Sequence, residues 1–183
     1  MSWKAAAVMA QPRRTLTTSL LARALQTGRL VLGGPAGPRW VSMPAIPESV
    51  SKARRFTESV LAEVAETDAD HVDDVVLVVS ELITNAVREV AKLDLSQGDA
   101  RSVRLGVAVH PRWTHLFAVD TAPALPVETH RGPLAGSGRG IPIIKSLAAL
   151  TWVDQDENGK TVHAVVTRTD VELTPGDRQA LNP

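Results

Sequence analysis

The chain has 183 residues, of which 44% are hydrophobic and 22% charged, so it suits one folded domain with a buried core and leaves little for a second. It has no uninterrupted apolar run of the roughly 18 residues that a membrane span needs, and no cysteine, which excludes disulfides, cysteine nucleophiles and thiolate metal sites and makes the cytoplasm the default location. The formal net charge is zero and no basic stripe interleaved with aromatic residues occurs, which argues against direct nucleic-acid binding.

The beginning of the chain differs from the rest in charge. Residues 1–47 hold six of the 20 basic residues and no acid, so 14 basic residues face 20 acidic ones in the remainder. The stretch 31–40 is rich in glycine and proline, as linkers are. We therefore expect residues 1–38 to form a disordered basic leader, 39–173 a folded domain and 174–183 a frayed C-terminal tail.

Two amphipathic helices are predicted in the first half of the domain. Residues 40–43 form a short strand that Pro44 ends. Residues 47–66 place apolar side chains at helical spacing after a proline, and residues 69–92 carry a longer, continuous apolar stripe. Each helix thus has one face suited to covering a sheet.

The hydrophobic period then changes from helix to strand. Residues 101–110 alternate apolar and other side chains, and 113–120 form a pairing strand across a turn at Pro111. A helix over 140–150 precedes a second hairpin, 151–170. The order helix, helix, strand, strand, helix, strand, strand predicts a mixed sheet with helices on one face.

The long helix carries a polar row. Glu81 and Asn85 lie one turn apart on the same face, and Arg88 extends the row. The polar, solvated side of an amphipathic helix explains this row without any function. Alternatively, the helix holds a carboxylate that activates a hydroxyl or water, and an amide oxygen that binds Mg²⁺, over a pocket.

Glycines alternate in front of the helix at 140–150. Gly136, Gly138 and Gly140, with Arg139 among them, form either a flexible lead-in to the helix or an anion site. In the second interpretation the bare main chain and the free N–H groups of the helix start receive a phosphate.

Two strand ends carry polar residues that have both a structural and a functional interpretation. Asp120 ends the second strand of the first hairpin, where a carboxylate often only forms a turn, and Thr161 opens the last strand. The functional alternative is that Asp120 accepts a hydrogen bond from an exocyclic amine such as that of adenine, with the Thr161 hydroxyl beside it.

Taken in order, these motifs resemble those of the GHKL ATPase superfamily, which includes gyrase, heat-shock chaperones, histidine kinases and mismatch-repair proteins. Within it, the sequence is most similar to small actinobacterial ATP-binding regulators that resemble anti-sigma-factor serine kinases. The resemblance covers residues 40–170 and rests on PESVSKARRF, VSELITNAVREV, AVDTAP, GRGIPIIKSLA and GKTVHAVV.

The resemblance implies an α/β two-layer sandwich with a mixed, mostly antiparallel sheet that binds ATP and Mg²⁺. Glu81 matches the general base that takes the proton from a partner's serine, Asn85 the Mg²⁺ ligand, Asp120 the reader of adenine and Thr161 its neighbour. The ATP-binding residues that it implies are Asn85, Arg88, Asp120, Gly136, Gly138, Arg139, Gly140 and Thr161.

The implied function is that of a serine/threonine protein kinase that phosphorylates an anti-sigma-factor antagonist in a partner-switching system. The alternative is a non-catalytic nucleotide-binding module that sequesters a sigma factor or another regulator. The oligomeric state stays open, a homodimer included. Two positions depart from the family pattern: Thr121, Ala122 and Pro123 replace the first glycine box, and Glu89 stands where small relatives usually carry His.

Overall fold

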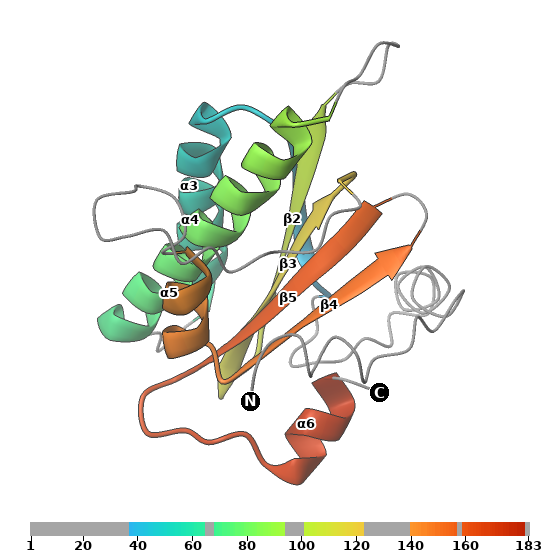
Figure 1. Cartoon of the computed structure of the whole chain (residues 1–183). Coiled ribbons are helices and arrows are strands. Elements are labelled where there is room, and N and C mark those ends of the chain that lie inside the picture. The colour runs from blue at the N-terminus through green and yellow to red at the C-terminus, as the bar shows by residue number, and fades with distance from the viewer. Residues whose placement is uncertain (1–36, 65–67, 94–100, 123–139, 157–158, 182–183) are drawn as a thin grey trace.

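A five-stranded antiparallel sheet runs through the computed structural model, which describes residues 37–64, 68–93, 101–122, 140–156 and 159–181 (Figure 1). The strands are β1 (Arg39–Pro44), β2 (Ser102–Val109), β3 (Trp113–Asp120), β4 (Leu150–Asp156) and β5 (Gly159–Thr167), in the spatial order β1-β2-β3-β5-β4. Each neighbouring pair is antiparallel. The sheet expected to be mixed and mostly antiparallel is therefore wholly antiparallel in the described strands.

Helices accompany this sheet on one face and at one end. They are α3 (Glu48–Ala62), α4 (Ala69–Ala91), α5 (Gly140–Leu147) and α6 (Pro175–Leu181). Helix α4 packs on β2, β3 and β5, α3 packs on β1 and β2, and α5 packs on α4, so these three helices form one layer and the sheet the other (Figure 1). The predicted α/β two-layer sandwich is confirmed. No helix in the described ranges has the length and apolar character needed to cross a membrane.

The predicted helices are present, with boundaries set by local hydrogen bonds. Helix α4 begins after Asp68, whose Oδ1 accepts the N–H of His71 at 2.7 Å and so caps the helix. Helix α5 ends three residues before the predicted position 150, because the N–H of Ala149 already donates to the carbonyl of Val165 as the chain enters β4. Local pairing with the sheet thus shortens the helix.

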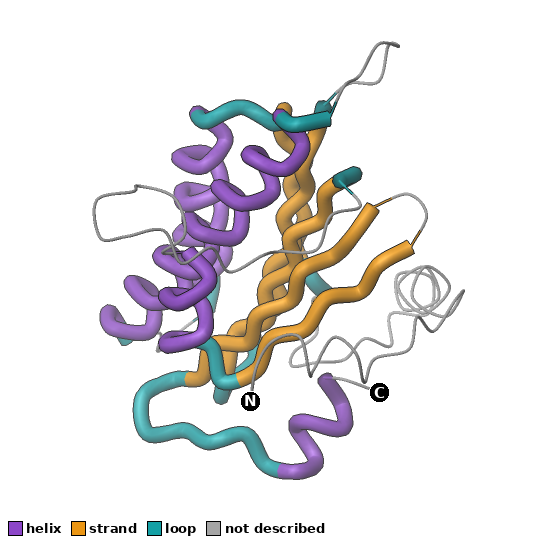
Figure 2. The backbone as a smooth tube through the Cα atoms, in the orientation of Figure 1, coloured by secondary structure: helices purple, strands orange, loops and turns teal. Residues whose placement is uncertain are grey.

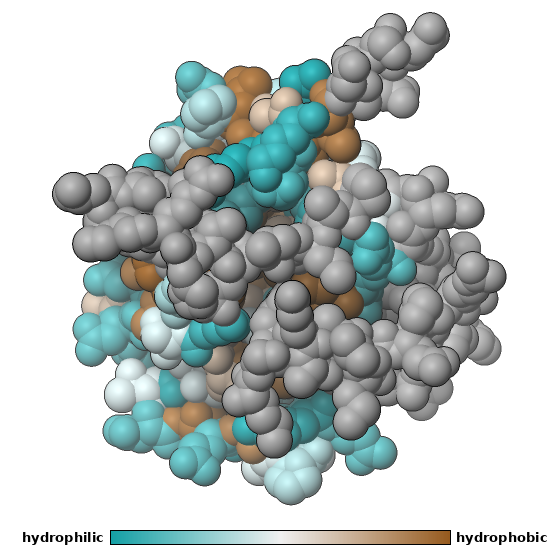
Figure 3. Space-filling model, viewed as in Figure 1, coloured by the Kyte–Doolittle hydropathy of each residue, from teal (hydrophilic) through white to brown (hydrophobic). Residues whose placement is uncertain are grey.

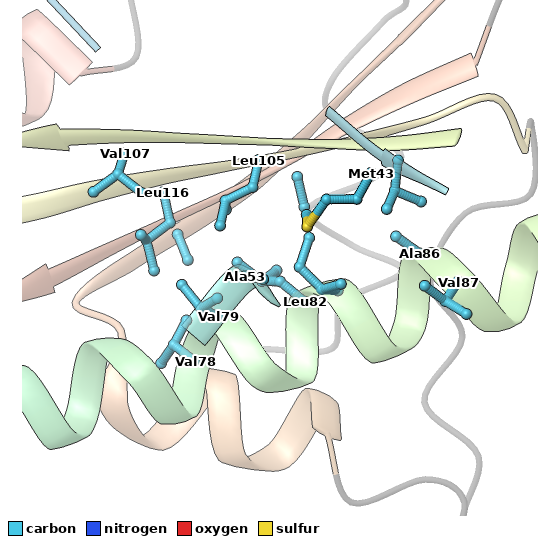
Figure 4. Packing of buried hydrophobic residues seen from close by; sticks show 14 of the residues in the cluster. Met43, Ala53, Val78, Val79, Leu82, Ala86, Val87, Leu105, Val107 and Leu116 are labelled. Atoms are coloured by element: carbon cyan, nitrogen blue, oxygen red, sulfur yellow. The ribbon is translucent and has the colours of Figure 1, made fainter. Parts of the chain in front are cut away.

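The apolar stripe of α4 forms the core with alternate residues of β2 and β3. Figure 4 shows Val79 and Leu82 of α4 directed toward Leu105 and Leu116 of the strands. The fully buried side chains of this core include Val75, Val78, Val79, Ile83, Val90, Val103, Leu105 and Leu116. Helical and strand periodicities therefore predicted which faces meet.

A second apolar cluster lies on the other face of the sheet. Trp113, Val165, Leu173 and Leu181 are buried there, and Leu181 belongs to α6. The loop after β5 leads to this helix (Figure 2). The expectation of a frayed tail from Thr174 is wrong in this respect, because a side-chain cap and a buried leucine stabilise a helix over 175–181.

The cap of α6 is reciprocal. The Thr174 hydroxyl accepts the N–H of Asp177, and the Asp177 carboxylate accepts the N–H and O–H of Thr174. Arg112 of the β2–β3 turn donates to the same carboxylate at 2.9 Å, which ties α6 to the sheet.

The described surface is mixed in polarity. In the view of Figure 3, hydrophilic residues cover much of it, with hydrophobic residues between them. Within the described ranges, Ile46 and Leu77 are the large apolar side chains classed as exposed, at 45% and 42%. The other large apolar side chains in this part of the chain are buried or half-buried.

Candidate functional site

The polar row of α4 faces the first residue of α5. A Cβ placed on Gly140 would lie 2.5 Å from Oε2 of Glu81 and 3.2 Å from Nδ2 of Asn85. Gly140 is buried, and Glu81 and Asn85 are half-buried. The main chain at the start of α5 therefore packs directly on the two polar side chains. A merely solvated helix face does not account for this contact.

Gly140 allows this close approach because it has no side chain. A helix start also presents main-chain N–H groups without intrahelical partners, which favours negative charge nearby. The arrangement thus combines a carboxylate, an amide oxygen and a helix N-terminus within contact distance. Gly136, Gly138 and Arg139, the other predicted members of this region, lie outside the described residues.

The predicted base reader, Asp120, lies at the end of β3 and is bonded to a lysine that the sequence analysis did not select. Nζ of Lys160 donates to Oδ1 of Asp120 at 2.9 Å and to the carbonyl of Ala122 at 2.9 Å. The N–H of Ala122 also donates to Oδ1. Both side chains of the ion pair are buried, with 2% of Lys160 and 1% of Asp120 exposed. The first glycine box of the family is thus replaced by a turn that a buried ion pair closes.

The second carboxylate oxygen of Asp120 is different. Oδ2 is buried and has no hydrogen-bond partner among the residues that the structure describes. Burial raises the pKa of the Asp120 carboxyl, and the hydrogen bond and charge of Lys160 only partly oppose this effect. A buried acceptor without a partner is costly, so Oδ2 is a candidate to receive a donor from a ligand.

Thr161 lies elsewhere than expected. Asp120 pairs with Lys160 across the β3–β5 ladder, whereas Thr161 pairs with Val119. Side chains alternate between the faces of a strand, and Val162 packs on the core beneath α4. Thr161 therefore points to the opposite face of the sheet from Asp120. The expected contact between its hydroxyl and the carboxylate is wrong, and Lys160 takes that place.

The last turn of α4 carries two charged residues of interest, Arg88 and Glu89. Glu89 lies one turn beyond Asn85 on α4, and its charge raises the pKa of the Asp120 carboxyl, which places the helix end near the strand end. Glu89 also pairs with Lys92 at 2.5 Å. Arg88 is half-buried in the last turn of α4. The departure at position 89 thus places a negative charge beside the site.

A signal for Lys160 was available in the sequence. Lys160 directly follows Gly159, and apolar residues recur at every second position after it, so strand alternation places it on the core face. Gly159 has a φ of 144°, and a Cβ there would collide with the Asp120 carbonyl oxygen. Only glycine permits this close approach, which holds the start of β5 against the end of β3.

The residues present fit a nucleotide with a divalent cation. Oδ2 of Asp120 offers a buried acceptor to a base, and the Asn85 amide offers a neutral oxygen to Mg²⁺. Within the described ranges, no group of three or more His, Cys, Asp or Glu side chains is arranged to hold a metal. A Mg²⁺ ion at Asn85 would therefore take its other ligands from phosphate oxygens and water, as is usual for Mg²⁺.

Comparisons with known proteins show the family and the fold of this chain. The family model of the histidine kinase-like ATPase domain matches residues 43–166, more than half of the chain. The crystal structure of the RsbU and RsbW domains of Rv1364c from Mycobacterium tuberculosis has the same fold, with a TM-score of 0.52 and 18% sequence identity. The match covers 77% of this chain and 36% of that one, so the chain spans about a third of its length. A search of curated proteins finds no significant match.

Proposed function

Because the chain belongs to the histidine kinase-like ATPase domain family, we propose that it binds ATP with Mg²⁺ and acts as a serine/threonine protein kinase of the anti-sigma-factor type. Its substrate is an antagonist protein with an acceptor serine, within a partner-switching system. The proposal of ATP binding follows from the family. The proposal of kinase activity rests on the site and on the sequence resemblance described above.

The observation that carries the proposal is the contact of Gly140 with Glu81 and Asn85. It brings together a carboxylate and an amide oxygen from the motif on α4 and the helix start from the separate glycine motif at α5. Phosphoryl transfer depends mainly on positioning and on stabilisation of the charge of the phosphoryl group. The carboxylate, the amide oxygen and the helix start would supply positioning and charge stabilisation if the γ-phosphate lies at the start of α5.

Each residue then has a distinct role. Asn85 holds Mg²⁺, which neutralises phosphate charge when bound. Glu81 accepts the proton of the partner's serine as the serine oxygen bonds to the γ-phosphorus, and the bond from that phosphorus to the β–γ bridging oxygen breaks to release ADP. Asp120 receives the exocyclic amine of adenine at Oδ2. Gly136, Gly138 and Arg139, together with Arg88, stay proposed as phosphate contacts.

The test compares Glu81→Gln with the wild-type protein. Glutamine keeps the size and hydrogen-bonding reach of glutamate but cannot accept a proton, so nucleotide binding should be preserved. Transfer to the antagonist should slow by roughly 10²- to 10⁴-fold, the loss typical of a general base. Single-turnover phosphorylation of a cognate antagonist measures the rate, and calorimetry measures ATP affinity in parallel.

Asp73→Asn is the matched control. Asp73 lies on the same helix as Glu81, is exposed, and stands eight positions away. Its replacement removes the same charge without touching the site, so the transfer rate should stay within about twofold. Equal rates for Glu81→Gln and wild type would remove Glu81 from the reaction.

A second candidate function is a nucleotide-binding module that sequesters a sigma factor or another regulator without turnover. The buried Lys160–Asp120 pair favours it, because Lys160 holds the turn at Ala122, which stands where the family usually has its first glycine box. Wild-type protein that binds ATP but transfers no phosphoryl group to any cognate antagonist would favour this function.

A further inference from the structure

The base end of the site presents two unused hydrogen-bonding groups. The Lys160 ammonium carries three donors, and the described bonds to Asp120 and Ala122 use two of them. Oδ2 of Asp120 is an acceptor without a partner in the described part of the chain. Because Nζ of Lys160 donates to Oδ1 of Asp120, the spare donor and the spare acceptor belong to two groups that are bonded to each other.

This pattern is complementary to one edge of adenine. The exocyclic N6 amine is a donor and the neighbouring ring nitrogen N1 is an acceptor. Nζ of Lys160 lies 2.9 Å from the other oxygen of the same carboxylate, so an amine bonded to Oδ2 of Asp120 would place the base next to Lys160. A lysine that is 98% buried and fixed by two bonds is also preorganised for this contact.

We propose that Lys160 is a specificity-determining residue that donates a hydrogen bond to N1 of the base while Asp120 accepts from the N6 amine. This inference rests on the proposed ATP binding and assigns to Lys160 the place expected for Thr161. Lys160 and Asp120 recognise the base together, since each holds the other in position.

The experiment replaces one ring atom of the ligand. Calorimetry with Mg²⁺ compares ATP with 1-deaza-ATP, in which a C–H group replaces N1, on the full chain. Wild-type protein should bind 1-deaza-ATP about 10- to 100-fold more weakly, as expected for the loss of one hydrogen bond from a charged donor. The comparison on wild-type protein needs no variant and is unaffected by any folding defect.

Two variants complete the test. Lys160→Met, checked for folding by circular dichroism, should bind ATP and 1-deaza-ATP with equal affinity, since it has no donor to lose. Thr161→Val is the matched control on the next residue and should keep the wild-type preference, because Thr161 pairs with Val119 and faces away from Asp120.

The outcomes separate this inference from the proposed function. If wild-type protein binds ATP and 1-deaza-ATP equally well, Lys160 does not read N1, and ATP binding still stands. If Lys160→Met binds ATP more tightly than wild type, Lys160 blocks the base site and the inference is overturned. If neither protein binds ATP, the proposed function fails and this inference fails with it.

Discussion

The two ends of the candidate site satisfy their polar groups in different ways. At the helix end, Glu81 and Asn85 are half-buried and contact the main chain of Gly140. At the strand end, Asp120 and Lys160 are almost completely buried and bonded to each other. Half-buried groups exchange partners with water at little cost, whereas a buried charge needs its partner. The helix end is therefore suited to chemistry alone, and the strand end to stability and recognition together.

The largest expected effect is on stability at the strand end. Lys160→Met should lower the free energy of unfolding by about 3–5 kcal/mol at neutral pH, because it leaves the Asp120 carboxylate buried without its cation. Urea unfolding followed by circular dichroism measures the change. A loss below about 1 kcal/mol would mean that the pair is dispensable to the fold.

Arg39→Met is the control for Lys160→Met, because it also replaces the cation of an ion pair with methionine, but at an exposed pair. Arg39 and Glu63 lie 2.7 Å apart, but their side chains are 52% and 57% exposed. Water and salt screen such a pair, so its loss should cost no more than about 1 kcal/mol. Similar losses for the two variants would break the contrast between buried and exposed pairs.

A smaller effect is expected at the helix end, and on function rather than stability. In Gly140→Ala, the new methyl group would meet Oε2 of Glu81 at 2.5 Å, so the carboxylate must move. The end of a glutamate side chain moves easily, and we expect the stability to change by less than about 1 kcal/mol. Displacement of a catalytic group by about 1 Å costs up to roughly 10²-fold in rate.

Single-turnover transfer and urea unfolding of the same sample test this separation. Gly37→Ala is the control, because a Cβ on Gly37 meets nothing within 4 Å. It should leave both quantities unchanged. If Gly140→Ala lost several kcal/mol with an unchanged transfer rate, the glycine would serve packing and not the position of Glu81.

The helix end of the site could be predicted from the sequence more fully than the strand end. Helical periodicity places Glu81 and Asn85 on one face without any knowledge of distant residues, and the core faces of the strands follow from alternation. The partner of Asp120 depends on the register between β3 and β5, because Lys160 is 40 residues away from Asp120 in the sequence. The family resemblance points to Thr161, and a difference of one residue in register exchanges the two faces of a strand, so Lys160 lies beside Asp120 instead.

The C-terminal helix was missed for a different reason. Its capping motif, Thr174 with Asp177, was present in the sequence, but α6 has only seven residues and one buried leucine. A helix this short gains most of its stability from tertiary contacts, here from the cluster that Leu181 forms with Trp113, Val165 and Leu173, which no local pattern predicts. Local rules thus found the long elements and missed the one that depends on a distant partner.

The last prediction concerns how the stability lost in Lys160→Met depends on pH. Burial raises the pKa of the Asp120 carboxyl and Lys160 lowers it, so the variant should have a still higher pKa at Asp120. A raised folded-state pKa gives stability that is present below the unfolded pKa and is lost as pH rises through the folded value. The difference between wild type and variant should therefore shrink on acidification, by up to about 1.4 kcal/mol per pH unit below the variant's pKa.

Urea unfolding of both proteins between about pH 7 and about pH 4 measures this difference. Burial lowers the pKa of His71 and, more strongly, of His115, so both proteins lose stability as pH falls below the ordinary histidine pKa of 6.5. This loss is common to the two proteins and cancels in the difference, which leaves Asp120 as the group that titrates differently. A difference that stays constant down to pH 4 would show that the cost of losing Lys160 does not depend on the charge of Asp120, and the strand end would then resemble the helix end in carrying no buried charge penalty.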